Sequence, residues 1–142
     1  MTDTAHSPSP RPAPEGWALP ALPDGFANHA GPFYFRKDGP VPGVGFFAEP
    51  RHANLGGVVH GGALATLADM ALFDICFRAL GRFRAATVTL NSEFLEPAPI
   101  GAFIEATGEL TRAGRTLLFA RGLISAEGKP VMSFSGSVRR LS

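Results

Sequence analysis

The chain has 142 residues, which suits one compact domain and is too short for two ordinary ones. Hydrophobic residues make up 45% of it, so a sizeable core can form. Its 13 Lys and Arg residues are scattered and the net charge is only +1, which argues against nucleic acid as the main partner. The single cysteine, Cys76, cannot form an internal disulfide, which fits a reducing, cytoplasmic compartment.

The start of the chain is rich in proline, with six of the 13 prolines lying before residue 25. It lacks the basic start and the apolar run of a secretory signal. We therefore expect a flexible tail over residues 1–25 and a single folded domain over residues 26–142. The first elements predicted in this domain are two short strands, in "FYFRKDG" and "VGFFAE", because Gly and Pro bound each run.

A long helix is predicted over about residues 62–80, where nearly every residue is apolar and Arg78 and Gly81 mark the end. Asp69, Asp74 and Arg78 interrupt it, and each would cost roughly 2.5–3.5 kcal/mol at a bilayer centre. The helix is therefore expected to be buried in a protein core rather than in a membrane. Asp74 and Arg78 are four residues apart and are predicted to form an exposed ion pair.

Asp69 lies in the middle of this apolar helix, where desolvation penalises a carboxylate and raises its pKa. Perturbed carboxylates concentrate at functional sites, so Asp69 is a candidate catalytic residue. The alternative is a structural role, with Asp69 hydrogen-bonded in the core or lying on a wet strip beside Thr66.

From residue 86 onward the hydrophobic pattern changes to period two, and "ATVTLNSEFLE" sets Val88 and Leu90 against Thr87 and Thr89. Three similar runs follow, "AFIEATGELT", "TLLFARGLISA" and "PVMSFSGSVRRL", joined by turns with Gly where positive φ is tolerated. Short turns between four strands predict an antiparallel meander. The expected fold class is α+β, with a curved antiparallel sheet around one long helix and a second copy of the chain closing the rest.

Common catalytic motifs are missing from the sequence, which has no Gly-x-Ser-x-Gly elbow, phosphate loop or dinucleotide fingerprint. Its four His and one Cys show no metal-ligand spacing, so neither a metal nor a cofactor is expected. Gly61 and Gly62 lie where a loop becomes the helix, and unpaired amides there can hold a carbonyl oxygen that gains negative charge. The alternative is that a tight turn simply needs glycine.

Gly61 and Asp69 are eight residues apart on the predicted helix, which corresponds to roughly 12 Å along its axis. A general base must lie within about 3 Å of the proton that it takes, or one water away. One substrate atom therefore cannot meet both groups of the same chain. If the two groups share a site, they come from different chains in a two-fold dimer with two equal sites at the interface.

The segment that begins at Asn54 resembles the signature "N-x5-HGG-x6-LAD-x-A" of hotdog-fold acyl-CoA thioesterases of the phenylacetate-degradation, PaaI-like type. The similarity extends from about residue 40 to the end and includes "TVTLNSEFLEPAPIG" and "TRAGRTL". The resemblance implies a hotdog fold and hydrolysis of a small aryl- or medium-chain acyl-CoA to the free acid and CoA.

The resemblance also implies a role for individual residues. Asp69 would be the general base or nucleophile, the Gly61 amide would hold the oxyanion, and Thr87 would help to orient water. His60 and Asn54 would support the donor loop and the thioester carbonyl, with His60 acting by loop anchoring or by direct substrate contact. In such enzymes the Asn, His and Gly come from one subunit of a homodimer and the Asp and Thr from the other, and two dimers can form a homotetramer. Substrate contacts are expected from Gly62, Thr66, Arg112, Arg115, Arg139 and Arg140, with the arginines meeting CoA phosphates.

Thioester hydrolysis needs little machinery, because a thiolate leaves readily and an oxyanion donor plus one base for water can suffice. Two alternative functions remain open on the same scaffold. An acyl-CoA hydratase or dehydratase would need an acid and a base acting across a carbon–carbon double bond, which this pattern fits less well. A non-catalytic acyl-CoA binding protein would be better served by an apolar residue in place of Asp69.

Overall fold

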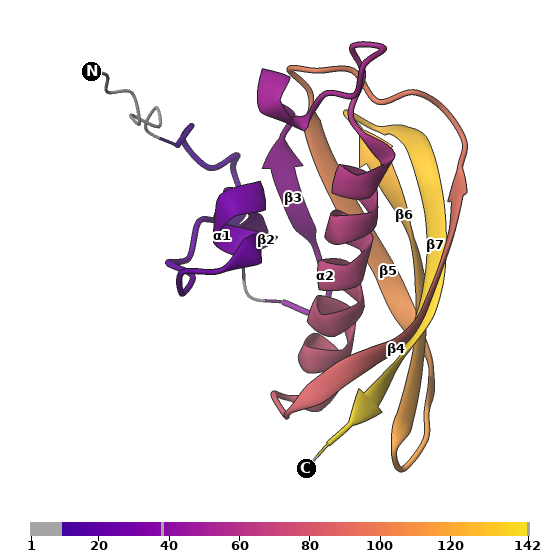
Figure 1. Cartoon of the computed structure of the whole chain (residues 1–142). Helices are drawn as coiled ribbons and strands as arrows, with labels where there is room; N and C mark the ends of the chain where they lie inside the picture. Colours follow the sequence, from indigo (N-terminus) through magenta and orange to yellow (C-terminus); the bar gives the residue numbers. More distant parts are fainter. Residues whose placement is uncertain (1–9, 38, 142) are drawn as a thin grey trace.

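One antiparallel sheet curls around a central helix in the computed structural model, which describes residues 10–37 and 39–141 (Figure 1). Its seven strands follow the order β1-β2-β3-β5-β6-β7-β4. The predicted α+β class and the curved sheet around one long helix are confirmed. The elements are β1 Trp17–Ala18, α1 Phe26–Ala30, β2 Tyr34–Arg36, β3 Val44–Phe47, the 3-10 helix Pro50–His52, α2 Gly61–Leu80, β4 Ala85–Phe94, β5 Phe103–Ala113, β6 Leu117–Ala126 and β7 Lys129–Arg140.

The core lies between α2 and the inner face of the sheet. One side of α2 is buried because its apolar residues recur at spacings of three and four, which places them on one face. These side chains pack against alternate, inward-facing residues of the strands, such as Ile104, Leu118 and Ile124, which are fully buried. No helix in the described ranges, 10–37 and 39–141, is long and apolar enough to cross a membrane. The buried residues of α2 are Leu64, Leu67, Ala68, Ala71, Leu72, Ile75 and Cys76.

The strand pairing differs from the predicted four-strand meander. β5, β6 and β7 do form a meander, but β4 pairs with the far side of β7 and becomes the edge of the sheet. The reason is that β3 already occupies the free side of β5. Residues 95–102 therefore cross the end of the sheet, where Val59 donates its N–H to the carbonyl of the buried Ala98.

A β-bulge in β4 changes which residues face the helix. Thr87 pairs with Val138, but Thr89 pairs with Ser137, so Val88 is an extra residue on this strand. The alternation predicted from the sequence put Thr87 and Thr89 on one face, and the bulge separates them. Thr87 faces α2, whereas the hydroxyl of Thr89 lies 2.7 Å from that of Ser137 on the outer face.

Part of the predicted tail is packed against the sheet. Trp17 is only 5% exposed, pairs with Arg36 across β1 and β2, and sets its ring edge-on to Phe103 at 5.1 Å between centroids. The hydroxyl of Tyr34 donates to the carbonyl of Arg11. The folded unit therefore includes residues before position 26, because a large aromatic side chain there gains from burial. Residues 1–9 of the predicted tail lie outside the described residues.

Asp74 and Arg78 do not form the exposed pair that their spacing predicted. Their side chains are only 11% and 15% exposed, and an Arg78 nitrogen lies 3.2 Å from the Asp74 carboxylate. Asp74 also accepts the N–H of Gly43 at 2.9 Å, while Arg78 donates to the carbonyls of Arg36, Lys37 and Gly39. The pair therefore holds the β2–β3 loop against α2. Burial raises the pKa of Asp74, although the Arg78 charge opposes this shift.

We expect Arg78→Ala to destabilise the protein by roughly 2–3 kcal/mol, somewhat less than the loss of a partner from a fully buried ion pair. The variant leaves Asp74 buried without its counter-ion. A carboxyl whose folded-state pKa is raised weakens the fold as pH rises above its ordinary value of 3.8, so the loss should be larger at pH 7 than at pH 4. Urea unfolding at the two pH values measures it.

The matched control is Arg121→Ala. Arg121 pairs with Glu109 on the surface, where the two side chains are 66% and 61% exposed, so its loss should cost less than about 1 kcal/mol at either pH. Equal effects of the two substitutions would mean that the Asp74–Arg78 pair is not needed to hold the loop.

Candidate active site

The start of α2 leaves one backbone amide free. His60 caps the helix, with its ring Nδ1 accepting the N–H of Gly62 at 2.8 Å and its carbonyl accepting the N–H of Ala63 at 2.9 Å. Within the described residues no hydrogen bond uses the N–H of Gly61. This donor lies at the positive end of a twenty-residue helix, where an oxygen with negative charge is stabilised.

A side chain at either glycine of this turn would also press on a neighbouring ring. A Cβ at Gly62 would lie 3.0 Å from Nδ1 of His60, in the space that the capping ring occupies. A Cβ at Gly61 would lie 3.3 Å from the ring of Phe94. The lack of side chains at this turn therefore leaves room for the capping ring and leaves the Gly61 amide open.

Asn54 shapes the loop that leads to this turn. Its side-chain oxygen accepts the N–H groups of Gly56 at 2.9 Å and Val58 at 3.2 Å, and these two hydrogen bonds hold residues 54–58 in a tight turn. Leu55 at the tip of this turn is fully exposed. In this chain the carbonyl oxygen of Asn54 is thus committed to the loop, and its amide NH₂ is the group left for a ligand.

His52 supports the same loop and was missed as a functional residue, because its position matched no metal-ligand spacing. Its Nδ1 accepts the N–H of Glu49, so its Nε2 donates to the carbonyl of Ala30 at 2.7 Å, and its carbonyl accepts the N–H of His60. Burial lowers the pKa of His52, which keeps the ring neutral near pH 7. The available signal was the three-residue spacing from Glu49, which forms a capping box around the 3-10 helix.

Asp69 and Thr87 form the second part of the site. The hydroxyl of Thr87 donates to Oδ1 of Asp69 at 2.6 Å, so the middle of α2 and the start of β4 contribute one group each. Asp69 is half-exposed within one chain and not buried as expected from the sequence. The reason is that the sheet covers only one side of α2, and Asp69 lies toward the uncovered side.

The uncovered face of α2 forms a continuous stripe that begins at Gly62 and includes Thr66, Asp69 and Phe73, spaced by three and four residues. The hydroxyl of Thr66 donates to the carbonyl of Gly62 at 2.9 Å and is thereby satisfied within the helix. Thr66 therefore lies on the same strip as Asp69 but does not contact it through a recorded hydrogen bond.

The structure brings these residues together in two groups. Asn54, His60, Gly61 and Gly62 gather at the start of α2, whereas Asp69 and Thr87 meet near its middle. One uninterrupted helix carries both groups, so eight residues still separate Gly61 from Asp69 by about 12 Å.

The arginines expected to meet CoA phosphates lie elsewhere in the chain. Arg112 and Arg139 extend from the outer face of the sheet, because their neighbours in the alternation point inward, and Arg115 lies in the β5–β6 turn. Arg140 instead places its guanidinium 4.6 Å from the centre of the Phe83 ring. None of these four side chains forms a hydrogen bond or an ion pair with Asp69, Thr87 or the turn at Gly61.

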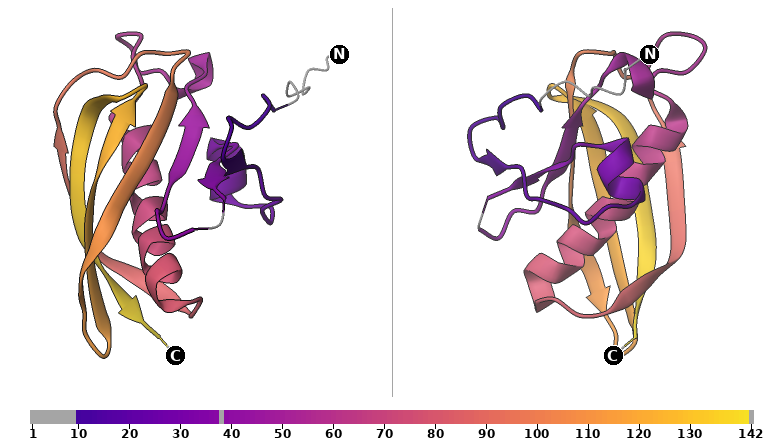
Figure 2. Two further views of the ribbon diagram at one scale, coloured as in Figure 1. Left: turned by 180° about the vertical axis from the view of Figure 1, so that it is seen from behind. Right: turned by 60° about the vertical axis from the view of Figure 1, so that its left-hand side comes forward.

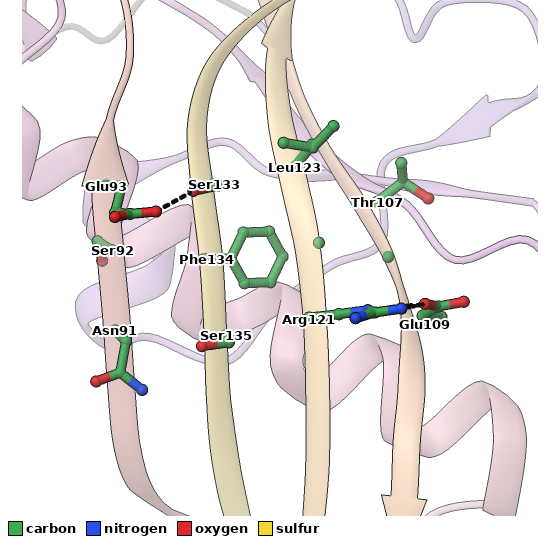
Figure 3. A pocket seen from close by; sticks show the side chains of 12 residues that line it. Asn91, Ser92, Glu93, Thr107, Glu109, Arg121, Leu123, Ser133, Phe134 and Ser135 are labelled. Carbon is green, nitrogen blue, oxygen red and sulfur yellow. Dashed lines mark hydrogen bonds and ion pairs between the residues drawn. The ribbon is translucent and has the colours of Figure 1, made fainter.

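A hollow of about 730 Å³ lies on the outer face of the sheet, with α2 behind the strands (Figure 3). Its rim is polar, with Arg121 paired to Glu109 at 2.7 Å and Ser133 donating to Glu93 at 3.3 Å. It is separated by the sheet from Asp69 and is not part of the candidate active site.

The family model described as the thioesterase superfamily matches residues 56–133, which run from the loop before α2 into β7. The chain belongs to the thioesterase superfamily. This match covers the turn from His60 to Gly62 and the Asp69–Thr87 pair, whereas Asn54 lies just before it.

Two relatives illustrate the range of this superfamily. The Pseudomonas aeruginosa protein named "Putative esterase PA0474" is 32% identical over 108 residues, which cover 75% of this chain and 81% of that protein. Mouse acyl-coenzyme A thioesterase 13 is 38% identical over 76 residues, or 51% of each chain. This chain therefore matches about half the length of the mouse enzyme.

Solved structures show the same fold. A mutant of the phenylacetic acid degradation protein PaaI from Thermus thermophilus has a TM-score of 0.71 and 26% identity, covering 81% of this chain and 97% of that one. The BH2602 protein from Bacillus halodurans, solved with CoA, has a TM-score of 0.64 and 28% identity, covering 70% and 66%. The predicted hotdog fold and the resemblance to PaaI-like thioesterases are confirmed.

The cap at His60 can be tested by comparing two substitutions. We expect His60→Ala to cost about 1 kcal/mol of stability, because the N–H of Gly62 loses its acceptor, and His60→Asn to cost much less, because Asn is a good N-cap. If the ring acts only as an anchor, the Asn variant should also keep most of the thioesterase activity. Thermal unfolding and a thiol-release assay measure the two effects, and an inactive but stable Asn variant would instead assign the ring a direct substrate contact.

Proposed function

We propose that this protein is an acyl-CoA thioesterase that hydrolyses a small aryl- or medium-chain acyl-CoA. The observation that carries the proposal is the free amide of Gly61 at the start of α2, on the same helix as the accessible Asp69–Thr87 pair, in a chain of the thioesterase superfamily. Support for CoA as part of the substrate comes from the name of the mouse relative and from the CoA-bound Bacillus halodurans structure.

In the proposed reaction the thioester carbonyl oxygen accepts the N–H of Gly61. Thr87 holds Oδ1 of Asp69, so Oδ2 takes a proton from a water molecule whose oxygen attacks the carbonyl carbon. Negative charge then develops on the carbonyl oxygen, where the helix dipole and the amide stabilise it. The carbon–sulfur bond breaks and CoA leaves as a thiolate. Direct attack by Asp69, which would form an anhydride that water then opens, uses the same geometry.

Both groups can act on one carbonyl only if two chains share the site. A spacing of about 12 Å along a rigid helix is fixed, so Gly61 of one chain must meet Asp69 of another. Two surfaces favour a two-fold dimer: the unpaired edge of β4, where Val88 and Phe94 are exposed, and the uncovered stripe of α2. Exposed apolar side chains on the outer sheet face, Leu117, Phe119 and Leu123, favour a further pairing of dimers into a tetramer.

Arg112, Arg115 and Arg139 are proposed to bind the CoA phosphates. All three are exposed and cluster at the end of the sheet that holds the β5–β6 turn, where their guanidinium groups can meet phosphate oxygens. The two alternative functions have less support. A hydratase needs a second acid or base beside Asp69, where Thr87 is the recorded partner, and a binding protein gains nothing from a carboxylate on an apolar helix.

We expect Asp69→Asn to lower the turnover number at least about a hundredfold, which is the usual effect of losing a general base. Asn still accepts the hydrogen bond of Thr87, so the fold and assembly should be unchanged. Thiol release from a panel of acyl-CoAs measures turnover, while circular dichroism and gel filtration check the fold. A variant with near-normal turnover would show that Asp69 is structural.

Sharing of the site between chains can be tested by complementation. Asp69→Asn removes the base, and Gly61→Pro removes the N–H that would hold the oxyanion, so each homodimer should be nearly inactive. In a dimer of one chain of each variant, one active site contains both substitutions and the other contains neither. Subunit exchange should therefore restore up to about half of the activity per heterodimer, by two-fold symmetry.

Controls for this experiment are the fold of each variant and the proof of exchange, since Gly61→Pro could distort the start of α2. Native mass spectrometry of the mixture counts the heterodimers directly. If verified heterodimers of folded chains stay inactive, the assignment of Gly61 and Asp69 to different chains is wrong, even if the wild-type protein hydrolyses thioesters.

A further inference from the structure

A second hollow, of about 900 Å³, lies beside the C-terminal half of α2. Its walls come from residues 18–23 and 35–37 of the N-terminal segment and from α2 and its end, between Met70 and Arg82. Figures 1 and 2 show that this segment packs on the side of α2 opposite to β4. Residues 18–37 lie before the segment that the superfamily model matches, which begins at residue 56.

The hollow adjoins the candidate active site. Met70 follows Asp69 directly in the chain, and Phe73 lies one turn further along the same uncovered stripe. Leu22, Phe35 and Phe77 continue the apolar lining away from Asp69. A thioester whose carbonyl carbon is held at Asp69 could therefore place its acyl group here, because the lining offers apolar surface that an acyl chain gains by contacting.

The far part of the hollow is positively charged. Among the described residues, four basic side chains and one carboxylate line it, and the carboxylate, Asp74, is already paired with Arg78. No ion pair joins Arg36 or Arg82 to a carboxylate in the part of the chain that the structure describes. The guanidinium of Arg36 lies 4.7 Å from the Trp17 ring centre, and that of Arg82 lies 5.7 Å from the Phe77 ring centre.

The hydrogen-bonding capacity of Arg36 is not used up within the described residues. Its Nε is buried and has no hydrogen-bond partner among the described residues, although buried polar atoms in proteins are nearly always paired. The side chain also lines the hollow, so an anion bound there could accept charge-assisted hydrogen bonds from the other guanidinium nitrogens.

We propose that this hollow binds the acyl group and that Arg36 and Arg82 bind an anionic group at its far end. The preferred substrates would then be CoA thioesters of dicarboxylic acids, with a free carboxylate at the end of a medium-length chain. This inference rests on the proposed thioesterase function. From Asp69 to Leu80 the helix rises about 16 Å, and the long arginine side chains shorten the span that the acyl chain must cover.

A phosphate of CoA is the other source of an anion for these cations, and the apolar lining favours the acyl group. The pantetheine arm carries two amide groups, which would lose hydrogen bonds to water against Phe73 and Phe77. A chain of methylene groups has no hydrogen bonds to water to lose. Its terminal carboxylate would lie at the far end of the hollow, where the cations are. An acyl chain that ends in a methyl group would leave the Arg36 guanidinium facing an apolar group, so the protein should bind such a substrate less tightly.

The test compares pairs of substrates of equal length. Suberoyl-CoA and octanoyl-CoA both have eight carbons and differ in the terminal carboxylate, and the matching N-acetylcysteamine thioesters lack the nucleotide. The variants are Arg36→Gln and Arg82→Gln. Arg82 follows the end of α2 and is exposed, so its variant keeps the test valid if Arg36→Gln fails to fold. Arg121→Gln on the outer face of the sheet is the matched control.

We expect the wild type to prefer the suberoyl substrates. Each variant should lower kcat/KM at least about tenfold for both suberoyl thioesters and by less than about twofold for both octanoyl thioesters, as the loss of a charge-assisted hydrogen bond predicts. The control should change none of the four values.

Two results would overturn the assignment. Equal losses on both CoA substrates and none on the nucleotide-free thioesters would assign the cations to a CoA phosphate. Unchanged values would make them ordinary surface charge. If the wild type hydrolyses octanoyl-CoA and suberoyl-CoA equally well, the dicarboxylate assignment is wrong and the thioesterase function stands. If it releases thiol from none of the substrates, the thioesterase function is refuted. In that case calorimetry with free suberate still decides: binding by the wild type that the two variants weaken supports the anion site, and no binding refutes it.

Discussion

An apolar helix of twenty residues must be covered on nearly every side, and the rest of this molecule follows from how α2 meets that requirement. The sheet buries one side, and the N-terminal segment packs beside the C-terminal half. A stripe through Thr66, Asp69 and Phe73 stays half-exposed. Asp69, the candidate base, lies on the surface of α2 that the chain alone does not cover. In the proposed dimer, the contact that covers this surface would also bring the two parts of the active site together.

Each part of α2 has a different role in this arrangement. Its first turn offers a free amide because His60 takes the neighbouring N–H, and its middle presents a carboxylate that Thr87 holds. Its C-terminal half carries an ion pair that attaches the β2–β3 loop and so places the N-terminal wall. The residues proposed to act on the thioester and those proposed to select the acyl group are thus spaced along one rigid element, and either set can change without moving the other.

The features that could be predicted from the sequence are those that depend on local pattern. The strand periods, the apolar run of α2 and the glycine turn after His60 belong to short segments, and the structure has each of them nearly where expected. The predicted pairing of β4 was wrong because pairing depends on which edge is free, and β3 had taken that of β5. In the candidate site, the isolated carboxylate of Asp69 could be identified from the sequence. The sequence did not predict on which face of β4 the Thr87 side chain lies. One extra residue, Val88, reverses the alternation and brings the Thr87 hydroxyl to Asp69.

The separation of Gly61 and Asp69 on α2 also determines how the proposed activity would depend on assembly. Loops can close a gap between catalytic groups by moving, but two residues on one continuous helix keep their spacing of about 12 Å as long as the helix is folded. No motion within a single chain can therefore bring the Gly61 amide to Asp69. If the Gly61 amide and Asp69 act on one carbonyl, as we propose, association must complete the site, and catalysis would be lost on dilution to monomers even when every monomer remains folded.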